Sequence, residues 1–234
     1  MTLPANRIHK RADWDARKPK GAPFILPRSQ VKILAFHYSS MDAERRKNHA
    51  DCAGVVRNIQ GFHMDSRGWN DIAYNWLVCH HGHAFEGRGW GVMSAATLGV
   101  NDKSQAVCFM GGDVKNRDDV TVPGREAMAD RANEALTLFP KGLHIGGHRE
   151  YVSTSCPGEE ITAWIAAKGW KVDKPAEQPW PIPMKKWFWA WAKWQRERFE
   201  YPTRAKWLHA RPKGVPPRVP DWAWVRLAAM TPKL

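Results

Sequence analysis

The sequence of 234 residues contains no long apolar run and begins without an apolar leader. No stretch approaches the eighteen or more apolar residues of a membrane-spanning helix. Residues 1–11 include basic side chains but no apolar stretch follows them, so no secretory signal peptide is predicted. We therefore expect the protein to start in a cytoplasm and to reach any extracellular target by another route.

Cysteine is also scarce, with four residues in the whole chain. Such few and widely spaced cysteines are not a disulfide framework. Cys52, Cys79 and Cys108 lie in apolar stretches and are interpreted as small core residues, because buried cysteine is common in cores. Cys156 lies in a polar stretch and is the candidate for a thiolate ligand.

Acidic residues are fewer than basic ones, 23 against 36, which gives a net charge of +13. Such a surface favours a polyanionic partner. Nucleic acid, an anionic membrane face and an anionic cell wall all fit this charge, and charge alone does not choose among them.

The composition changes near residue 171, which predicts two domains. Residues 1–172 alternate apolar strands with amphipathic helices, and residues 173–183 form a proline-punctuated linker. Residues 184–234 are basic and rich in tryptophan. From residue 180 onward the chain holds eight of its fourteen tryptophans and twelve Lys or Arg side chains.

Three interpretations of the tryptophan-rich segment are open. It could be a small domain packed around its aromatic side chains, a cell-wall module whose tryptophans stack on sugars, or a segment that binds a membrane or nucleic acid. We favour a small packed domain with a face that binds anionic wall polymers.

The first domain is expected to be an α/β fold, a mixed central sheet flanked by helices. Apolar runs predict strands and periodic apolar residues predict helices. Tyr74, Trp76 and Val78 should share one face of their strand, because side chains alternate. The expected strands are 31–36, 73–79, 106–110 and 143–147, and the expected helices are 50–63, 123–139 (ended by Pro140) and a last one ended by Gly169.

A metal site is suggested by three residues at strand ends or loops. His37 ends one strand, His148 ends another, and Cys156 follows eight residues later in a loop that can fold back. Two imidazoles and a thiolate suit zinc, and three protein ligands leave a position open for catalysis. The alternative from spacing alone is a core cysteine and two ordinary histidines.

Five ordered motifs carry a resemblance to a known family. The chain resembles the N-acetylmuramoyl-L-alanine amidases of the peptidoglycan-recognition-protein and phage-lysozyme type over about residues 8–170. The motifs are Arg11–Trp14, Phe36–His37, Gly68–Asn75, Phe85–Trp90 and Gly147–Arg149 with Cys156–Gly158.

The resemblance implies a zinc amidase that cuts the bond between the lactoyl group of muramic acid and L-alanine of the stem peptide in bacterial peptidoglycan. It places zinc on His37, His148 and Cys156. Tyr74 would be catalytic, and Thr154, at a position that holds lysine or threonine in relatives, would be a second hydrogen-bond donor. The candidate substrate-binding residues are Arg88, Asn75 and Asn101.

The sequence departs from some relatives at two places. Cys108 occupies the position where certain amidases carry a glutamate base, which places the chain with the tyrosine-dependent branch. Ser94–Thr97 lacks a histidine that many relatives have there, and this leaves the expected zinc ligands intact.

Several other polar residues suggest sites but have plainer interpretations. His80, His81 and His83 could form a second metal site, but exposed histidines at a hairpin turn are the favoured interpretation. His63 is expected to cap or pack beneath a helix end, and Asp71 is expected to be structural.

The resemblance therefore predicts a monomeric phage endolysin, stored in the host cytoplasm and released to the cell wall, usually through a holin. Two alternatives remain. One is a recognition protein of the same fold that binds peptidoglycan without cutting it. The other is a basic regulator that binds nucleic acid or polymerase, although no obligatory nucleic acid is expected.

Overall fold

The computed structural model describes residues 7–40, 48–111, 120–139 and 141–171. The chain divides into two units, Met1–Asp173 and Lys174–Leu234, and every described residue belongs to the first. The predicted linker 173–183, the tryptophan-rich segment 184–234 and Pro140 lie outside the described residues, so the predictions made for them stay predictions.

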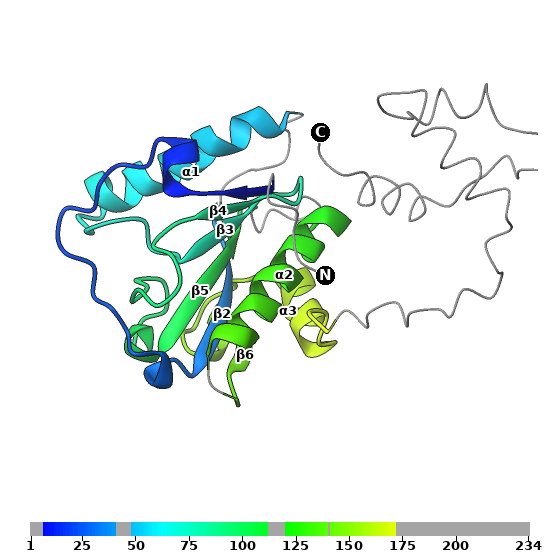
Figure 1. Cartoon of the computed structure of the whole chain (residues 1–234). Helices are drawn as coiled ribbons and strands as arrows, with labels where there is room; N and C mark the ends of the chain where they lie inside the picture. Colours follow the sequence, from blue (N-terminus) through cyan, green and yellow to red (C-terminus); the bar gives the residue numbers. More distant parts are fainter. Residues whose placement is uncertain (1–6, 41–47, 112–119, 140, 172–234) are drawn as a thin grey trace, which may run out of the picture. The chain divides into compact units, whose positions relative to one another are not determined.

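A six-stranded mixed sheet forms the centre of the described unit (Figure 1), in the order β1-β4-β3-β5-β2-β6. β3 and β4 are antiparallel, whereas all other neighbouring pairs are parallel. The predicted mixed sheet is therefore confirmed. The strands are β1 (Ile8–His9), β2 (Ile33–Tyr38), β3 (Trp76–Val78), β4 (Ala84–Glu86), β5 (Ser104–Phe109) and β6 (His144–Gly147).

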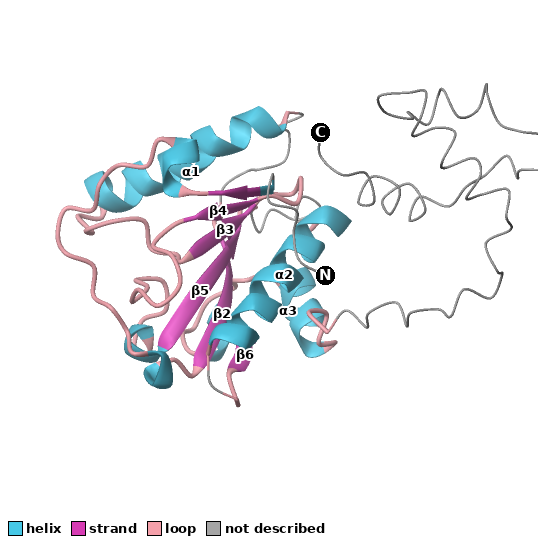
Figure 2. Cartoon of the chain, viewed as in Figure 1, coloured by secondary structure: helices cyan, strands magenta, loops and turns pink. Residues whose placement is uncertain are grey.

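Helices cover both faces of this sheet, as Figure 2 shows with helices in cyan and strands in magenta. α1 (Cys52–Gly61) lies on one face, and α2 (Val122–Leu138) and α3 (Glu159–Ala166) lie on the other. The short helices and turns are η2 (Arg11–Trp14), η3 (Arg28–Gln30), η4 (His49–Asp51), η5 (Phe62–Ser66), η6 (Asn101–Lys103) and η7 (His148–Glu150).

An apolar core lies on each face of the sheet, between the strands and the helices. There are two cores because successive side chains of a strand point to opposite faces. Phe36, Val78 and Val107 belong to the core that includes α2 and α3 residues. Leu77 and Cys108 belong to the core that includes α1 residues. His37 pairs with Cys108, and Cys108 pairs with Leu77, so His37 points to the α1 face as well.

The helix and strand predictions hold with corrections at element ends. The helix predicted at 50–63 is α1 followed by the π turn η5, but Phe62 is 50% exposed rather than part of the apolar face. The strand predicted at 73–79 is shorter, since β3 begins at Trp76.

The prediction that Tyr74 shares a strand face with Trp76 and Val78 is wrong. Tyr74 packs against the α1-side core, whereas the other two belong to the opposite core. The reason is that Tyr74 precedes the strand, so the alternation of β3 does not extend to it. The Tyr74 side chain consequently lies on the same face as His37.

Every helix in the described ranges is too short or too polar to cross a membrane.

Candidate metal centre

The three predicted metal ligands come together at one edge of the sheet. β2 and β6 are parallel neighbours, so their carboxyl ends meet, and they carry His37 within β2 and His148 directly after β6. Cys156 approaches from the loop between η7 and α3. One ligand atom of each residue lies within 4.8 Å of those of the other two. The Cys156 Sγ is 3.8 Å from the His37 Nδ1, and the two imidazole rings are 4.5 Å apart.

Main-chain contacts fold the cysteine loop back onto the strands. The Arg149 amide donates a hydrogen bond to the Cys156 carbonyl at 2.9 Å. The Cys156 amide donates to the Thr154 hydroxyl at 3.2 Å, and the Tyr38 amide donates to the Cys156 Sγ at 3.4 Å. The predicted return of this loop is confirmed, and the thiol that it presents is 8% exposed.

A buried threonine fixes the orientation of His37. The Thr97 hydroxyl, fully buried, lies 3.1 Å from the His37 Nε2, while the Nδ1 faces Cys156. The Asn101 carboxamide oxygen in turn accepts hydrogen bonds from the Thr97 amide at 2.9 Å and from the Ser94 hydroxyl at 3.3 Å. A second hydrogen bond on the far nitrogen is the usual way to orient a ligating imidazole.

Thr97 was not among the predicted functional residues. The stretch 94–97 stands out in the sequence only for the histidine that it lacks. A threonine gives no local sequence signal for a contact with a histidine sixty positions away, so this part of the site depended on the structure.

The donor set fits a zinc ion. Burial and the charge of His148 lower the pKa of His37 well below its ordinary value, and burial lowers the pKa of His148. Both imidazoles are therefore neutral near pH 7, which is the form that binds a metal. In a tetrahedral zinc site the donor atoms stand roughly 3.3–3.8 Å apart, and the contact between Cys156 and His37 agrees with this spacing.

Tyr74 lies beside this cluster. Its ring centroid is 5.5 Å from that of His37, and the side chain is half-buried. Burial, together with the neighbouring thiols Cys108 and Cys156, raises the pKa of Tyr74 well above its ordinary value. The phenol consequently stays protonated at neutral pH and can donate a hydrogen bond.

The predicted substrate-binding residues fall into different environments. Asn75 is fully buried, and its carboxamide contacts three main-chain groups, of Gly89, Val92 and Ala106. These contacts give Asn75 a structural role, and its predicted contact with substrate stays a prediction. The prediction for Asn101 acquires a structural alternative, because its carboxamide oxygen supports Thr97 as described above.

Two further predicted residues lie nearer the surface. Arg88 is half-buried and donates to the carbonyls of Ile72 and Met93 at 2.7 and 2.9 Å, so part of its guanidinium holds the loop. Thr154 is exposed two residues before Cys156, with its hydroxyl accepting the Cys156 amide. Their roles toward a substrate stay predictions.

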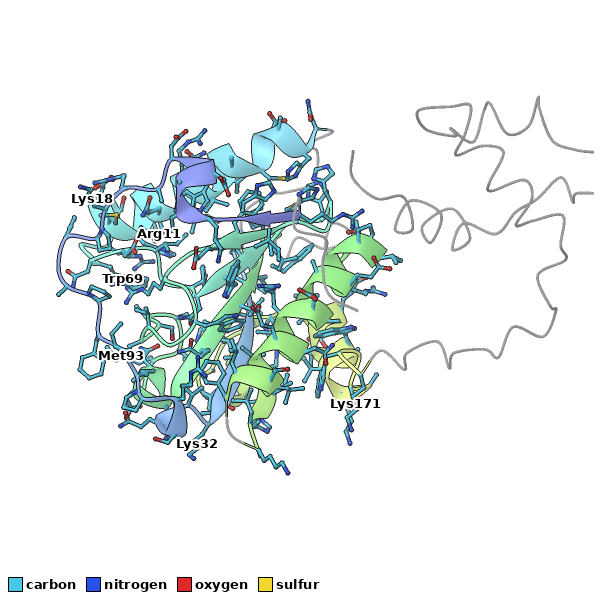
Figure 3. All side chains as sticks on the ribbon, viewed as in Figure 1. Arg11, Lys18, Lys32, Trp69, Met93 and Lys171 are labelled. Carbon is cyan, nitrogen blue, oxygen red and sulfur yellow. The ribbon has the colours of Figure 1, made fainter. Side chains whose placement is uncertain are left out.

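The structural interpretations of His63 and Asp71 agree with their contacts. His63 packs at the end of α1 and accepts a hydrogen bond from the Ala73 amide at 3.2 Å. Asp71 is buried and accepts from the Gln60 carboxamide at 2.7 Å. It also pairs with Arg11 at 3.0 Å, and Figure 3 shows Arg11 beside α1.

Known proteins resemble this chain in both sequence and fold. Peptidoglycan-recognition protein SC2 of Drosophila simulans is 37% identical over 165 residues, which cover 70% of this chain and 85% of that protein. This chain belongs to the peptidoglycan-recognition protein and N-acetylmuramoyl-L-alanine amidase family. The N-acetylmuramoyl-L-alanine amidase of Mus musculus is 34% identical over 157 residues, covering 66% of this chain. Scans against protein-family models gave no match.

The fold agrees with the family assignment. A crystal structure of peptidoglycan recognition protein-LE in complex with tracheal cytotoxin, a monomeric diaminopimelic acid-type peptidoglycan, superposes with a TM-score of 0.63 and 30% identity. It covers 69% of this chain and 94% of that one. Some family members are much longer, since this chain spans 46% of peptidoglycan-recognition protein LE of Drosophila melanogaster and 29% of the mouse amidase.

Proposed function

We propose that this protein is a zinc-dependent N-acetylmuramoyl-L-alanine amidase that hydrolyses the amide between the lactoyl group of N-acetylmuramic acid and L-alanine in bacterial peptidoglycan. The observation that carries the proposal is the convergence of His37, His148 and Cys156 beside a protonated tyrosine. Recognition without catalysis would require none of these groups.

His37, His148 and Cys156 would hold the zinc ion. Zinc bound by three protein ligands supplies a Lewis acid that activates water and polarises an amide carbonyl. His148 and Tyr74 are partly exposed, whereas His37 is buried, with 2% of its surface exposed. A substrate can therefore reach the cluster from the side of His148 and Tyr74. A stem-peptide amide would approach from that side.

Tyr74 would donate a hydrogen bond to the carbonyl oxygen as this atom gains negative charge during attack. Its raised pKa keeps the proton on the phenol throughout the neutral range. Thr97 and Asn101 act one step away, because they hold the His37 ring in the orientation that directs Nδ1 toward Cys156. The exposed hydroxyl of Thr154 is a second candidate donor toward the substrate.

The test is product analysis on purified peptidoglycan together with zinc content. The native chain should release new L-alanine amino termini without new reducing sugar ends. Cys156→Ser should lose both zinc from this centre and activity, whereas Tyr74→Phe should keep zinc and lose activity about 10²–10³-fold, the usual cost of one oxyanion donor. His144→Gln, a change at an exposed histidine paired with Glu150, is the matched control and should keep both.

Wall binding by native protein that releases no new amino termini would contradict the proposal and make the chain a recognition protein. A salt-sensitive shift of DNA with no affinity for walls would instead favour a nucleic-acid-binding regulator.

The proposal extends to a lytic role. A net charge of +13 and the tryptophan-rich segment favour anionic wall polymers as additional partners. We infer a phage endolysin that acts on the wall of its host after release from the cytoplasm. Expression of the chain with and without a holin should then give lysis only with the holin, and lysis in neither culture would contradict this role.

A further inference from the structure

A second cluster of cysteine and histidine side chains lies at the end of β3, apart from the candidate centre. Its members are His49, Cys52, Cys79 and His81, and one ligand atom of each lies within 4.8 Å of all the others. The Cys52 Sγ is 3.4 Å from the His81 Nδ1, and the Cys79 Sγ is 3.9 Å from the His49 Nδ1. The sequence predicts both cysteines to be core residues and His81 to be an exposed turn residue.

Two turns form this cluster, and 27 positions separate Cys52 in the first turn from Cys79 in the second. Asn48 caps the η4 turn through the Ala50 amide, and this turn presents His49 and Cys52 together. In the β3–β4 hairpin, the amide of Gly82 donates to the Cys79 carbonyl at 2.9 Å, which brings His81 beside Cys79. Each turn contributes one cysteine and one histidine, and His81 is half-buried rather than exposed.

We propose that His49, Cys52, Cys79 and His81 bind a second zinc ion as a structural site. Two thiolates and two imidazoles within reach of a common centre form the tetrahedral S₂N₂ set that zinc prefers. The separations of 3.4 and 3.9 Å are close to the roughly 3.3–3.8 Å expected between donors of a tetrahedral zinc site. Four protein ligands leave no position for substrate, in contrast to the three of the candidate catalytic centre.

The surroundings also favour a bound cation. Cys52 and Cys79 are 1% and 0% exposed, as buried ligands of a structural ion are. Zinc binds cysteine as the thiolate, and a buried thiolate requires a cation beside it.

Two more histidines surround the cluster as supporting groups. The His83 ring stacks on His49 with 3.5 Å between centroids, and the His9 Nε2 lies 2.9 Å from the His83 Nδ1. The ion would fasten the start of α1 to the β3–β4 hairpin, on the sheet face that also carries His37.

The experiment counts zinc in the purified full-length chain and in variants, after saturation with zinc and gel filtration. We expect two zinc ions per chain in the native protein, one in Cys79→Ser, one in Cys156→Ser and none in the double variant. Cys108→Ser is the matched control, because Cys108 is also buried in the α1-side core but belongs to neither cluster. It should keep two.

Cobalt substitution separates the two sites by their ligands. The ion in Cys156→Ser should be bound by two thiolates, and the ion in Cys79→Ser by one. The thiolate-to-cobalt absorption per ion should consequently be about twofold stronger in Cys156→Ser. If Cys79→Ser does not fold, as judged by circular dichroism, His81→Gln replaces it, since His81 is half-buried and its loss leaves no large cavity.

Equal zinc content in the native chain and in a folded Cys79→Ser or His81→Gln variant would overturn the proposal. A Cys52–Cys79 disulfide in protein purified under reducing conditions and saturated with zinc would also overturn it. Neither result depends on amidase activity, so this site and the proposed function stand or fall separately.

Discussion

At the scale of single residues, the candidate centre depends on groups beyond its three candidate ligands. His37 reaches Cys156 through Nδ1 only while its ring is held in one orientation, and the hydroxyl of Thr97 lies 3.1 Å from the other nitrogen. Thr97 is itself fully buried and hydrogen-bonded to Asn101, so the ring has little freedom to turn.

Thr97→Val should weaken zinc binding at this centre by about 10–100-fold, the usual effect of losing an outer hydrogen bond to a metal ligand. Valine has nearly the same shape, so the fold should be retained. Competition with a chromophoric chelator measures the affinity, preferably in a Cys79→Ser background that contains only this centre. Thr97→Ser keeps the hydroxyl and should restore binding. An unchanged affinity in the valine variant would show that the threonine does not orient the ring.

His63 should make the stability depend on pH. Burial, followed by the charges of Arg88 and Arg67, lowers the pKa of His63 to about 4 in the folded protein. In the unfolded chain His63 becomes protonated near pH 6.5, whereas in the folded chain it stays neutral until about pH 4. The free energy of unfolding therefore falls as the pH is lowered from about 6.5 to about 4. The full effect is at most about 3 kcal/mol.

His63→Asn keeps an acceptor for the Ala73 amide but does not titrate, so it should remove this part of the slope. Urea unfolding of both proteins at pH 7 and pH 4.5 gives the difference, and His144→Asn, at an exposed histidine, is the control. A parallel loss of stability in native and His63→Asn proteins would contradict the assignment.

At the scale of elements, one buried carboxylate connects three segments. Asp71 accepts from Arg11 of η2, from Gln60 at the end of α1, and from the Ile72 amide of its own loop. The loop after Asp71 leads to Tyr74, so this network fixes the segment that carries the catalytic candidate. Cys52 and Cys79 connect α1 to the β3–β4 hairpin on the same face.

Asp71→Ala should destabilise the fold by about 2–4 kcal/mol, because it leaves buried donors without their acceptor. Urea unfolding monitored by tryptophan fluorescence measures the change. The matched control is Asp65→Ala, which removes an exposed carboxylate paired with Arg17 and should leave the midpoint nearly unchanged. Similar midpoints for the two variants would show that the Asp71 network does not stabilise the fold.

At the scale of the whole molecule, the chain combines a family domain with a basic segment that follows it. The two units of the chain divide at Asp173, and the sequence predicts a proline-punctuated linker at 173–183. Extended linkers are preferred sites of proteolytic cleavage.

Limited proteolysis of the full chain should therefore cut first within 173–183 and leave a product of about residues 1–173 with the same zinc content as the full chain. Mass spectrometry of the early fragments identifies the cut. A protease that accepts many side chains is required, so that specificity does not decide the position. First cuts inside residues 48–111 would contradict the predicted division.

Local and ordered signals allowed much of the fold and the candidate metal centre to be predicted from the sequence. Apolar runs and helical periodicity are properties of short segments, and they indicated β2, β5, β6, α1 and α2 to within a few residues. His37, His148 and Cys156 were found because each occurs within a motif whose order along the chain resembles one family.

The tertiary structure alone decided contacts between distant segments. It placed Tyr74 on the α1 face, because the strand starts three residues later than the apolar pattern suggests. It brought Thr97 to His37 and the pair Cys79–His81 to the pair His49–Cys52. Pairings of this kind depend on which strands and turns become neighbours in the sheet. Neither hydrophobic periodicity nor the spacing of residues along the chain contains that information.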